Sequence, residues 1–198
     1  MNREINSSVR KNILITGMPG VGKTTLIKKI ANELKHLSPA GFYTDEIRVH
    51  GERVGFKLID LNGRRAILSH KDIKSPYRVG KYGVDIKAFE EFLSLIPFFS
   101  PSTCVIIIDE IGKMECFSKK FKILLNEILN SKKLLIATIA MKGAGLISEI
   151  KKRKDIILFS LTTNNRDFIL NEILKELLHT TLPFSKEIEC RPKQKTKK

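Results

Sequence analysis

The stretch Gly17-Met18-Pro19-Gly20-Val21-Gly22-Lys23-Thr24 fits the pattern G-x-x-x-x-G-K-[ST] at every fixed position. A short apolar run at residues 12–16 precedes it and is typical of a buried strand, and residues 23–37 follow with apolar side chains at helical spacing. Glycines let the backbone turn its N–H groups inward around anionic oxygens, and the start of a helix adds the positive end of its dipole. The sequence therefore predicts a phosphate-binding loop (P-loop) between a strand and a helix.

Two side chains of this loop carry predicted chemistry beyond the backbone. Lys23 is expected to reach the β- and γ-phosphates as a mobile positive charge and to take part in catalysis, and the hydroxyl of Thr24 is expected to ligate Mg²⁺. The predicted nucleotide-binding residues of the loop are Gly17, Met18, Pro19, Gly20, Val21, Gly22, Lys23, Thr24 and Thr25.

A second motif lies where a β-branched run at residues 103–109 meets Asp109 and Glu110. Such a run predicts a central strand buried on both faces, and ligands of parallel sheets bind at the carboxyl edge, where the strand ends. Asp109, at the Walker-B position, is expected to hold Mg²⁺ together with Thr24, and Glu110 to orient and deprotonate a water molecule. A carboxylate directly after the Walker-B aspartate favours hydrolysis. The structural alternative is that Glu110 caps the turn at residues 111–116.

The fold class follows from the order of the predicted elements. Short alternating stretches at residues 42–68, separated by turn signals, indicate an antiparallel meander, whereas strands and helices alternate on both sides of it. We therefore expect an α/β, three-layer P-loop NTPase fold with a mostly parallel sheet and an inserted β-meander. The further predicted strands are 133–139 and 155–161, and the further predicted helices are 85–95, 119–130 (capped by Ser118), 145–153 and 166–178. A single domain is expected over residues 1–183, followed by a basic, disordered tail at 184–198.

Composition excludes several classes of protein. The 198 residues are 42% hydrophobic and 29% charged, which is ordinary for a globular chain, and no apolar run has the length of a membrane span. Three cysteines (Cys104, Cys116 and Cys190) without CxxC spacing favour neither a disulfide framework nor a zinc site, so a cytoplasmic location is expected. The net charge of +15 fits either lysine-rich surfaces or a nucleic-acid partner. A monomer is favoured.

The residues after the Walker-B strand carry a family resemblance. Asp109-Glu110-Ile111-Gly112-Lys113-Met114-Glu115 resembles the signature of the THEP-type (thermophilic) nucleoside-triphosphatases, the family that includes the cancer-related nucleoside-triphosphatase. Residues 41–48, residues 77–85 and Asn165-Arg166-Asp167 are similar to further stretches of that family, so that the likeness runs from about residue 11 to residue 178. The resemblance implies slow, magnesium-dependent hydrolysis of several nucleoside triphosphates, with diphosphates as poorer substrates. Ile111 and Gly112 are accordingly added to the predicted nucleotide-binding residues, with Asp109 and Glu110.

Hydrolysis also needs positive charge at the γ-phosphate beyond the lysine and the metal. Arg166, which follows a predicted strand, is the catalytic candidate, and it either contacts phosphate or stacks on the base. The alternative is that Asn164 or Asn165 caps the helix and Arg166 is solvated in its first turn. Lys113 is equally well explained by a place near the phosphates and by a place on the surface.

Two other basic segments are assigned structural roles. Arg153 is interpreted as a solvated helix end. Gly80-Lys81-Tyr82-Gly83 has no Ser or Thr after its lysine and no strand before it, so we reject it as a second phosphate loop and interpret it as a lid edge or a connection.

Three functions are compatible with these residues. The first is hydrolysis of ATP, GTP, CTP and UTP or TTP with low base selectivity, because the chain has no N-K-x-D stretch and no other base-reading motif. The second is phosphoryl transfer to a nucleoside, a nucleotide or a polynucleotide, against which the Asp109-Glu110 pair argues. The third is a nucleic-acid-binding module that uses ATP hydrolysis as a timer, which only the net charge favours.

Overall fold

The computed structural model describes residues 12–181. Its elements in chain order are β1 (Asn12–Gly17), α1 (Lys23–Glu33), the short 3₁₀ helix η1 (Lys35–Leu37), β2 (Ala40–Val49), β3 (Glu52–Asp60), β4 (Arg65–His70), β5 (Arg78–Val79), β6 (Tyr82–Val84), α2 (Ile86–Ser94), β7 (Val105–Ile111), the 3₁₀ helix η2 (Glu115–Phe117), α3 (Lys119–Asn130), β8 (Leu134–Ile139), α4 (Leu146–Lys151), β9 (Ile156–Leu161) and α5 (Ile169–Thr181). The tail predicted at residues 184–198, together with Cys190, lies outside the described residues.

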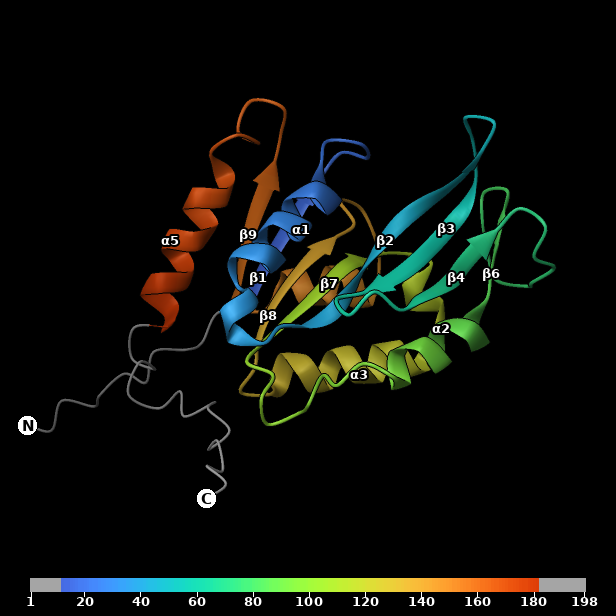
Figure 1. The fold of residues 1–198 in the computed structure, drawn as a ribbon. Coiled ribbons are helices and arrows are strands. Elements are labelled where there is room, and N and C mark those ends of the chain that lie inside the picture. Colours follow the sequence, from blue (N-terminus) through green and yellow to red (C-terminus); the bar gives the residue numbers. More distant parts are fainter. Residues whose placement is uncertain (1–11, 182–198) are drawn as a thin grey trace, which may run out of the picture.

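All strands join one nine-stranded sheet in the order β5-β6-β4-β3-β2-β7-β8-β1-β9. The strands β2, β7, β8, β1 and β9 pair in parallel, and β3, β4, β6 and β5 extend the sheet in antiparallel fashion. Figure 1 shows the carboxyl ends of the parallel strands at one edge of the sheet, next to the loop between β1 and α1. The predicted α/β fold with an inserted meander is confirmed.

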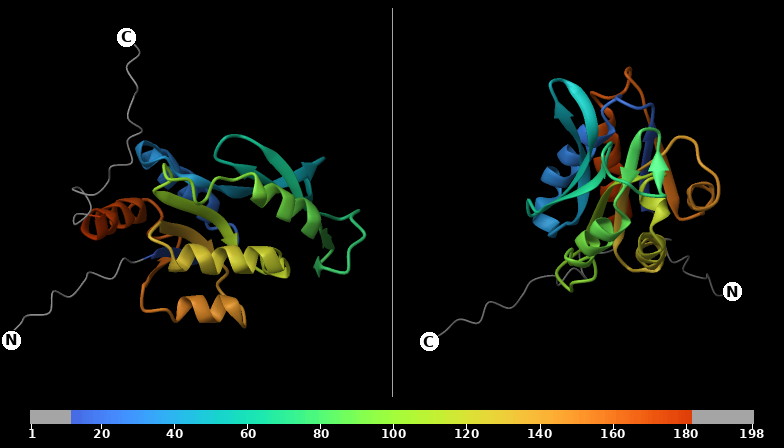
Figure 2. Two further views of the ribbon diagram at one scale, coloured as in Figure 1. Left: turned by 90° about the horizontal axis from the view of Figure 1, so that it is seen from below. Right: turned by 90° about the vertical axis from the view of Figure 1, so that its right-hand side faces the viewer.

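Helices cover both faces of the parallel part of the sheet (Figure 2). On one face α1 and α5 pack against β1 and β7 through an aliphatic cluster that includes Ile27, Ile107 and Ile173. On the other face α2, α3 and α4 pack on a second cluster, in which Phe42 makes edge-to-face contacts with Phe89 and Phe92. Strands β1 and β8 are therefore buried along their whole length, as expected for a three-layer fold.

The joint between the parallel and antiparallel parts depends on Gly41. Strand β2 pairs with β7 on one side and with β3 on the other, and Gly41 lies opposite Ile107 of β7. Its φ of +150° and the close approach of the Ile107 carbonyl leave no room for a β-carbon. A glycine here lets the meander join the parallel sheet directly.

The end of one strand, the start of one helix and the assignment of one segment differ from the sequence prediction. Strand β7 continues through Asp109 and Glu110 to Ile111, and the last helix begins at Ile169, not at Arg166. The Asn164 and Asn165 caps proposed for that helix are wrong, because Asn165 instead accepts a hydrogen bond from the amide of Thr162 and closes the preceding loop. The segment at residues 80–83 is more than the plain connection that was one of its two interpretations. It belongs to the hairpin β5–β6, whose strands are too short to show alternation.

Within residues 12–181 no helix has the length and apolar character needed to cross a membrane. Cys104 and Cys116 are both half-buried.

Candidate active site

The loop between β1 and α1 takes the shape that its glycines permit. Gly20 and Gly22 have φ values of +78° and +108°, and open space surrounds the position of a β-carbon at both, so it is the backbone conformation that calls for glycine. Gly17 is required for a different reason, since a β-carbon there would lie 2.5 Å from the carbonyl oxygen of Leu161 in β9. Helix α1 begins at Lys23, directly after Gly22, so that its unpaired amides face the same edge of the sheet.

Lys23 lies across the mouth of the loop. Its Nζ donates hydrogen bonds to the carbonyl oxygens of Gly17 (3.1 Å) and Met18 (3.3 Å). The ammonium group is thus held where the loop amides converge, which is the position expected for a lysine that contacts phosphates.

Three threonine hydroxyls surround the carboxylate of Asp109, which is 1% exposed. Thr24 of α1 donates to Oδ2 at 2.7 Å, and Thr138 of β8 donates to Oδ1 at 2.6 Å. Thr44 of β2 reaches Oδ2 at the longer distance of 3.5 Å. Hydrogen bonds from Thr24 and Thr138 fix the orientation of the carboxylate from two different elements, although only Thr24 was predicted from the sequence.

Thr24 and Asp109 have the donor chemistry that Mg²⁺ requires. Both offer hard oxygen atoms, and the 2.7 Å between Thr24 Oγ1 and Asp109 Oδ2 is close to the spacing of about 2.9 Å between neighbouring ligands of an octahedral Mg²⁺ at roughly 2.1 Å. A cluster of three or more His, Cys, Asp or Glu side chains suited to a metal is not found within residues 12–181. Two oxygen ligands from the protein suit an ion whose remaining ligands would be substrate oxygens and water.

Glu110 lies beside Asp109 with its side chain in the cleft next to the P-loop. The two residues occupy an irregularity in the pairing of β7 with β8, between Ile108 and Ile111, and the peptide bond between them is cis. Burial raises the pKa of Glu110, the nearby charge of Asp109 also raises it, and Lys23 opposes both by lowering it. A carboxylate with a raised pKa is a better proton acceptor than an ordinary one.

A third carboxyl group, Glu115, lies beneath this pair in η2. It is almost completely buried, and its Oε2 accepts a hydrogen bond from the amide of Gly112 at 3.2 Å. Burial, above all, and the nearby charges of Glu110 and Asp109 raise the pKa of Glu115 to about 8, although its backbone hydrogen bonds act in the opposite direction. The group is therefore protonated at neutral pH and adds no negative charge beside the two carboxylates.

Lys23, Thr24 and Glu110 meet in a cleft of about 790 Å³ that runs from the P-loop to the hairpin β2–β3. Its lining includes most of the predicted loop residues and Glu110. Residues that the sequence analysis missed complete it: Lys28, Thr44, Asp45, Glu46, Arg48, Arg53, Phe56, Ala140, Met141 and Lys142. The loop after β8 is held in place by Lys151, whose Nζ donates to the carbonyls of Ala140 and Met141 at 2.7 and 2.9 Å. Thr138, which binds Asp109 but does not line the cleft, has a sequence signal of its own, because it is a polar residue near the end of an apolar strand.

Arg166 lines a different cavity from Glu110. This smaller cavity, of about 260 Å³, lies on the other side of the P-loop, between Gly20, Lys29 and the loop that follows β9. The arginine side chain is 60% exposed and lies 3.9 Å from Asp167. The structure thus brings Arg166 to the P-loop but not to Glu110.

Several other predicted residues lie outside both cavities. Ile111 is fully buried in the core, and its carbonyl accepts the amide of Ala140, while the Gly112 amide is bound to Glu115. Met18 and Lys113 are exposed and line neither cavity.

Arg153 is not a solvated helix end. It forms an ion pair with Asp155 at 2.8 Å and donates to the carbonyl of Leu129. Arg153 therefore has a structural role at the start of β9.

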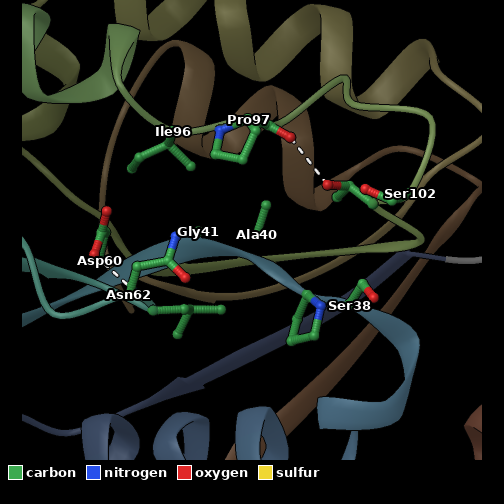
Figure 3. A pocket seen from close by; sticks show the side chains of 11 residues that line it. Ser38, Ala40, Gly41, Asp60, Asn62, Ile96, Pro97 and Ser102 are labelled. Atoms are coloured by element: carbon green, nitrogen blue, oxygen red, sulfur yellow. Dashed lines mark hydrogen bonds between the residues drawn. The ribbon is translucent and has the colours of Figure 1, made fainter.

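A third cavity, of about 230 Å³, opens at the opposite edge of the sheet, by the start of β2 (Figure 3). Its buried carboxylate, Asp60, accepts the amides of Asn62 and Arg64 through Oδ1, and Arg64 Nε lies 3.5 Å from Oδ2. Through these contacts the Asp60 carboxylate stabilises the turn between β3 and β4. The cavity lies at the amino end of the parallel strand β2, away from the P-loop.

Comparison with known proteins agrees with this geometry. A sequence model of the family described as NTPase matches residues 12–174. The chain belongs to this NTPase family.

Among relatives of the NTPase family, the nucleoside-triphosphatase THEP1 of Thermotoga sp. (strain RQ2) is 49% identical, over 83% of this chain and 94% of the relative. The human cancer-related nucleoside-triphosphatase is 37% identical, over 83% and 95%. The crystal structure of THEP1 from Aquifex aeolicus superimposes with a TM-score of 0.76 at 42% identity, covering 84% of this chain and 98% of that one. The family resemblance and the P-loop NTPase fold expected from the sequence are confirmed.

Proposed function

We propose that this chain hydrolyses nucleoside 5′-triphosphates to nucleoside diphosphate and phosphate, slowly, with Mg²⁺ and with low base selectivity. The observation that carries the proposal is the meeting of Lys23 and Glu110 in one cleft, beside the Thr24–Asp109 pair. The relatives named above support the class of reaction, because both are nucleoside-triphosphatases by name.

Each group has one task in the proposed reaction. The amides of the P-loop and Lys23 bind the phosphate chain, and Thr24 and Asp109 hold Mg²⁺, whose charge neutralises phosphate oxygens. Glu110 accepts a proton from a water molecule and directs that water at the γ-phosphorus. The raised pKa of Glu110 suits this role, and Glu110 lines the same cleft as Lys23.

The two cavities beside the P-loop indicate how the triphosphate is oriented. Because Thr24 and Asp109 would hold Mg²⁺ and Glu110 would activate the water, the γ-phosphate would lie on the side of these residues, in the larger cleft. The nucleoside then extends toward the smaller cavity, where Arg166 is exposed beside the loop. We therefore assign Arg166 to contact with the nucleoside or the α-phosphate, and not to the γ-phosphate. An exposed arginine stacks on any base, which fits low base selectivity.

Phosphate release from ATP, GTP, CTP and UTP tests the proposal in the wild type and in Glu110→Gln. The variant keeps the shape of the side chain and loses the proton acceptor, so we expect turnover to fall roughly 100-fold or more while triphosphate affinity stays the same. Glu127→Gln, an exposed change on α3, is the matched control. Wild-type turnover in Glu110→Gln would remove the glutamate from the mechanism, and activity only with an added acceptor would make the enzyme a kinase.

A further inference from the structure

The large cleft continues past the catalytic groups to two arginines on the hairpin β2–β3. Arg48 and Arg53, here called the hairpin arginine pair, lie opposite each other on adjacent strands. Both line the same cleft as Lys23 and Glu110. In Figure 1 this hairpin extends well beyond the helices that cover the parallel part of the sheet.

Contacts with neighbouring groups hold both guanidinium groups in place. Arg53 Nε donates to the hydroxyl of Tyr82 at 3.1 Å, and its guanidinium lies over the ring of Phe56, 5.1 Å from the ring centre. Arg48 Nη1 donates to the carbonyl of Gly51 at 2.7 Å. A planar cation fixed in this way loses little conformational freedom when it binds an anion.

One carboxylate serves both arginines. Glu46 accepts hydrogen bonds from Arg48 Nε at 2.8 Å and from Arg53 Nη1 at 2.9 Å, and these bonds keep the pKa of Glu46 below its ordinary value, the bond from Arg53 most of all. The cluster therefore carries net positive charge. Each guanidinium has five N–H donors, and the contacts that the structure shows use only some of them. Donors remain for a further anion.

The hairpin arginine pair is too far along β2 to belong to the γ-phosphate site. Thr44 marks the metal end, since its hydroxyl lies 3.5 Å from Asp109 Oδ2. At about 3.3 Å per residue, Arg48 is about 13 Å farther along the strand. The pair thus lies beyond the γ-phosphate site, at a distance that leaves room for a second ligand. A cleft of about 790 Å³ is also larger than a phosphate chain needs, since drug-sized ligands fill pockets of roughly 300–1,000 Å³.

We propose that the hairpin arginine pair binds the phosphate group of a second ligand, a phosphomonoester that occupies the cleft together with the triphosphate. Two guanidinium groups side by side match the oxygens of a phosphate. The remaining space, beside Phe56, accommodates the organic part of the ligand. This inference rests on the proposed function, because the triphosphate must occupy the P-loop for the second ligand to lie beyond it.

Calorimetric titration of the enzyme saturated with Mg²⁺ and a non-hydrolysable ATP analogue tests the proposal, with CMP, cytidine and inorganic phosphate as probes. We expect CMP to bind one-to-one and cytidine not to bind. Arg48→Gln and Arg53→Gln should each weaken CMP binding about tenfold or more, because each loses a charge-assisted hydrogen bond to phosphate. Arg65→Gln, an exposed change on β4 outside the cleft, should bind CMP like the wild type.

Three results would overturn the proposal: CMP that binds only when the analogue is absent, affinity unchanged in both cleft variants, or inorganic phosphate that binds as tightly as CMP. Thermal unfolding checks that each variant is folded, and Arg48, at the exposed tip, keeps the test valid if Arg53→Gln is unstable. Failure of the wild type to bind the analogue would count against the proposed function instead. Analogue binding and phosphate release without CMP binding would remove the second site alone.

Discussion

The two halves of the sheet place their polar groups in different ways. In the parallel half, β1 and β8 are fully buried, so polar groups occur at the carboxyl ends, as backbone amides and short side chains such as Thr138. In the meander half the strands are partly exposed, and long charged side chains such as Arg48 and Arg53 extend from them. The positions of the catalytic groups are thus set by the backbone at the ends of the parallel strands. The positions of the arginines on the opposite wall of the cleft are set by the register of β2 against β3.

Lys23→Ala should have the largest effect, and this effect should be on triphosphate binding and not on the free energy of unfolding. The variant loses roughly two charge-assisted hydrogen bonds to phosphate at about 2 kcal/mol each, so triphosphate affinity should fall about 1,000-fold. Its unfolding free energy should stay within about 0.5 kcal/mol of the wild type, because the side chain packs on no core. Titration with the ATP analogue and urea unfolding measure both quantities, with Lys122→Ala on α3 as the control. A large loss of stability would show that the parallel half needs this lysine to fold.

Gly41→Ala tests the joint between the halves and should act on stability. A β-carbon there meets the carbonyl of Ile107 and requires an unfavourable φ, so the unfolding free energy should fall by roughly 3 kcal/mol. Gly63→Ala in the β3–β4 turn is the matched control. It also has positive φ but open space around it, and should cost roughly 1 kcal/mol. Equal losses in urea unfolding would mean that the close approach of β2 to β7 carries no stability.

Glu115→Gln should change how stability depends on pH. The folded-state pKa of Glu115 is about 8, against 4.5 for the free side chain. Between these values the unfolded chain releases the proton and the folded chain keeps it, so stability declines as pH rises to 8 and the loss is complete above it. Glutamine keeps the oxygen that accepts the hydrogen bond and cannot release a proton, so the variant should avoid a loss on the order of 4 kcal/mol. Urea unfolding at pH 5 and pH 8.5 measures the difference, and parallel pH profiles would contradict the assignment.

The sequence was sufficient for the parts of the molecule whose signals are local. The P-loop, the Ser118 cap of α3 and the buried run of β7 each depend on residues that are near one another in the chain, and the structure has them where they were expected. The strands β5 and β6 were missed because two or three residues show no alternation. Thr138, Arg48 and Arg53 were missed because what they meet is set by the register of strands that are distant in sequence.

The smallest effects are expected at the carboxylate of Asp109, which accepts a hydrogen bond from Thr138 in the parallel half and one from Thr44 in the meander half. Thr138→Val removes the hydroxyl that donates to Asp109 Oδ1 at 2.6 Å, whereas Thr44→Val removes one at 3.5 Å. A short hydrogen bond to a charged acceptor contributes about 1.5 kcal/mol, whereas a hydrogen bond at the distance limit contributes little. We therefore expect kcat/KM to fall about tenfold for Thr138→Val and less than about twofold for Thr44→Val. Both variants keep the side-chain shape, so each serves as the control for the other.

Steady-state phosphate release at varied Mg²⁺ concentration would measure kcat/KM and the Mg²⁺ requirement of both threonine variants. The loss in Thr138→Val should appear partly as a higher Mg²⁺ requirement, because the carboxylate that holds the ion is less firmly oriented. An equal loss in Thr44→Val would mean that the meander orients the metal ligand as strongly as β8 does. The catalytic centre would then depend on strand register as well, and the division between the two halves of the sheet would no longer hold.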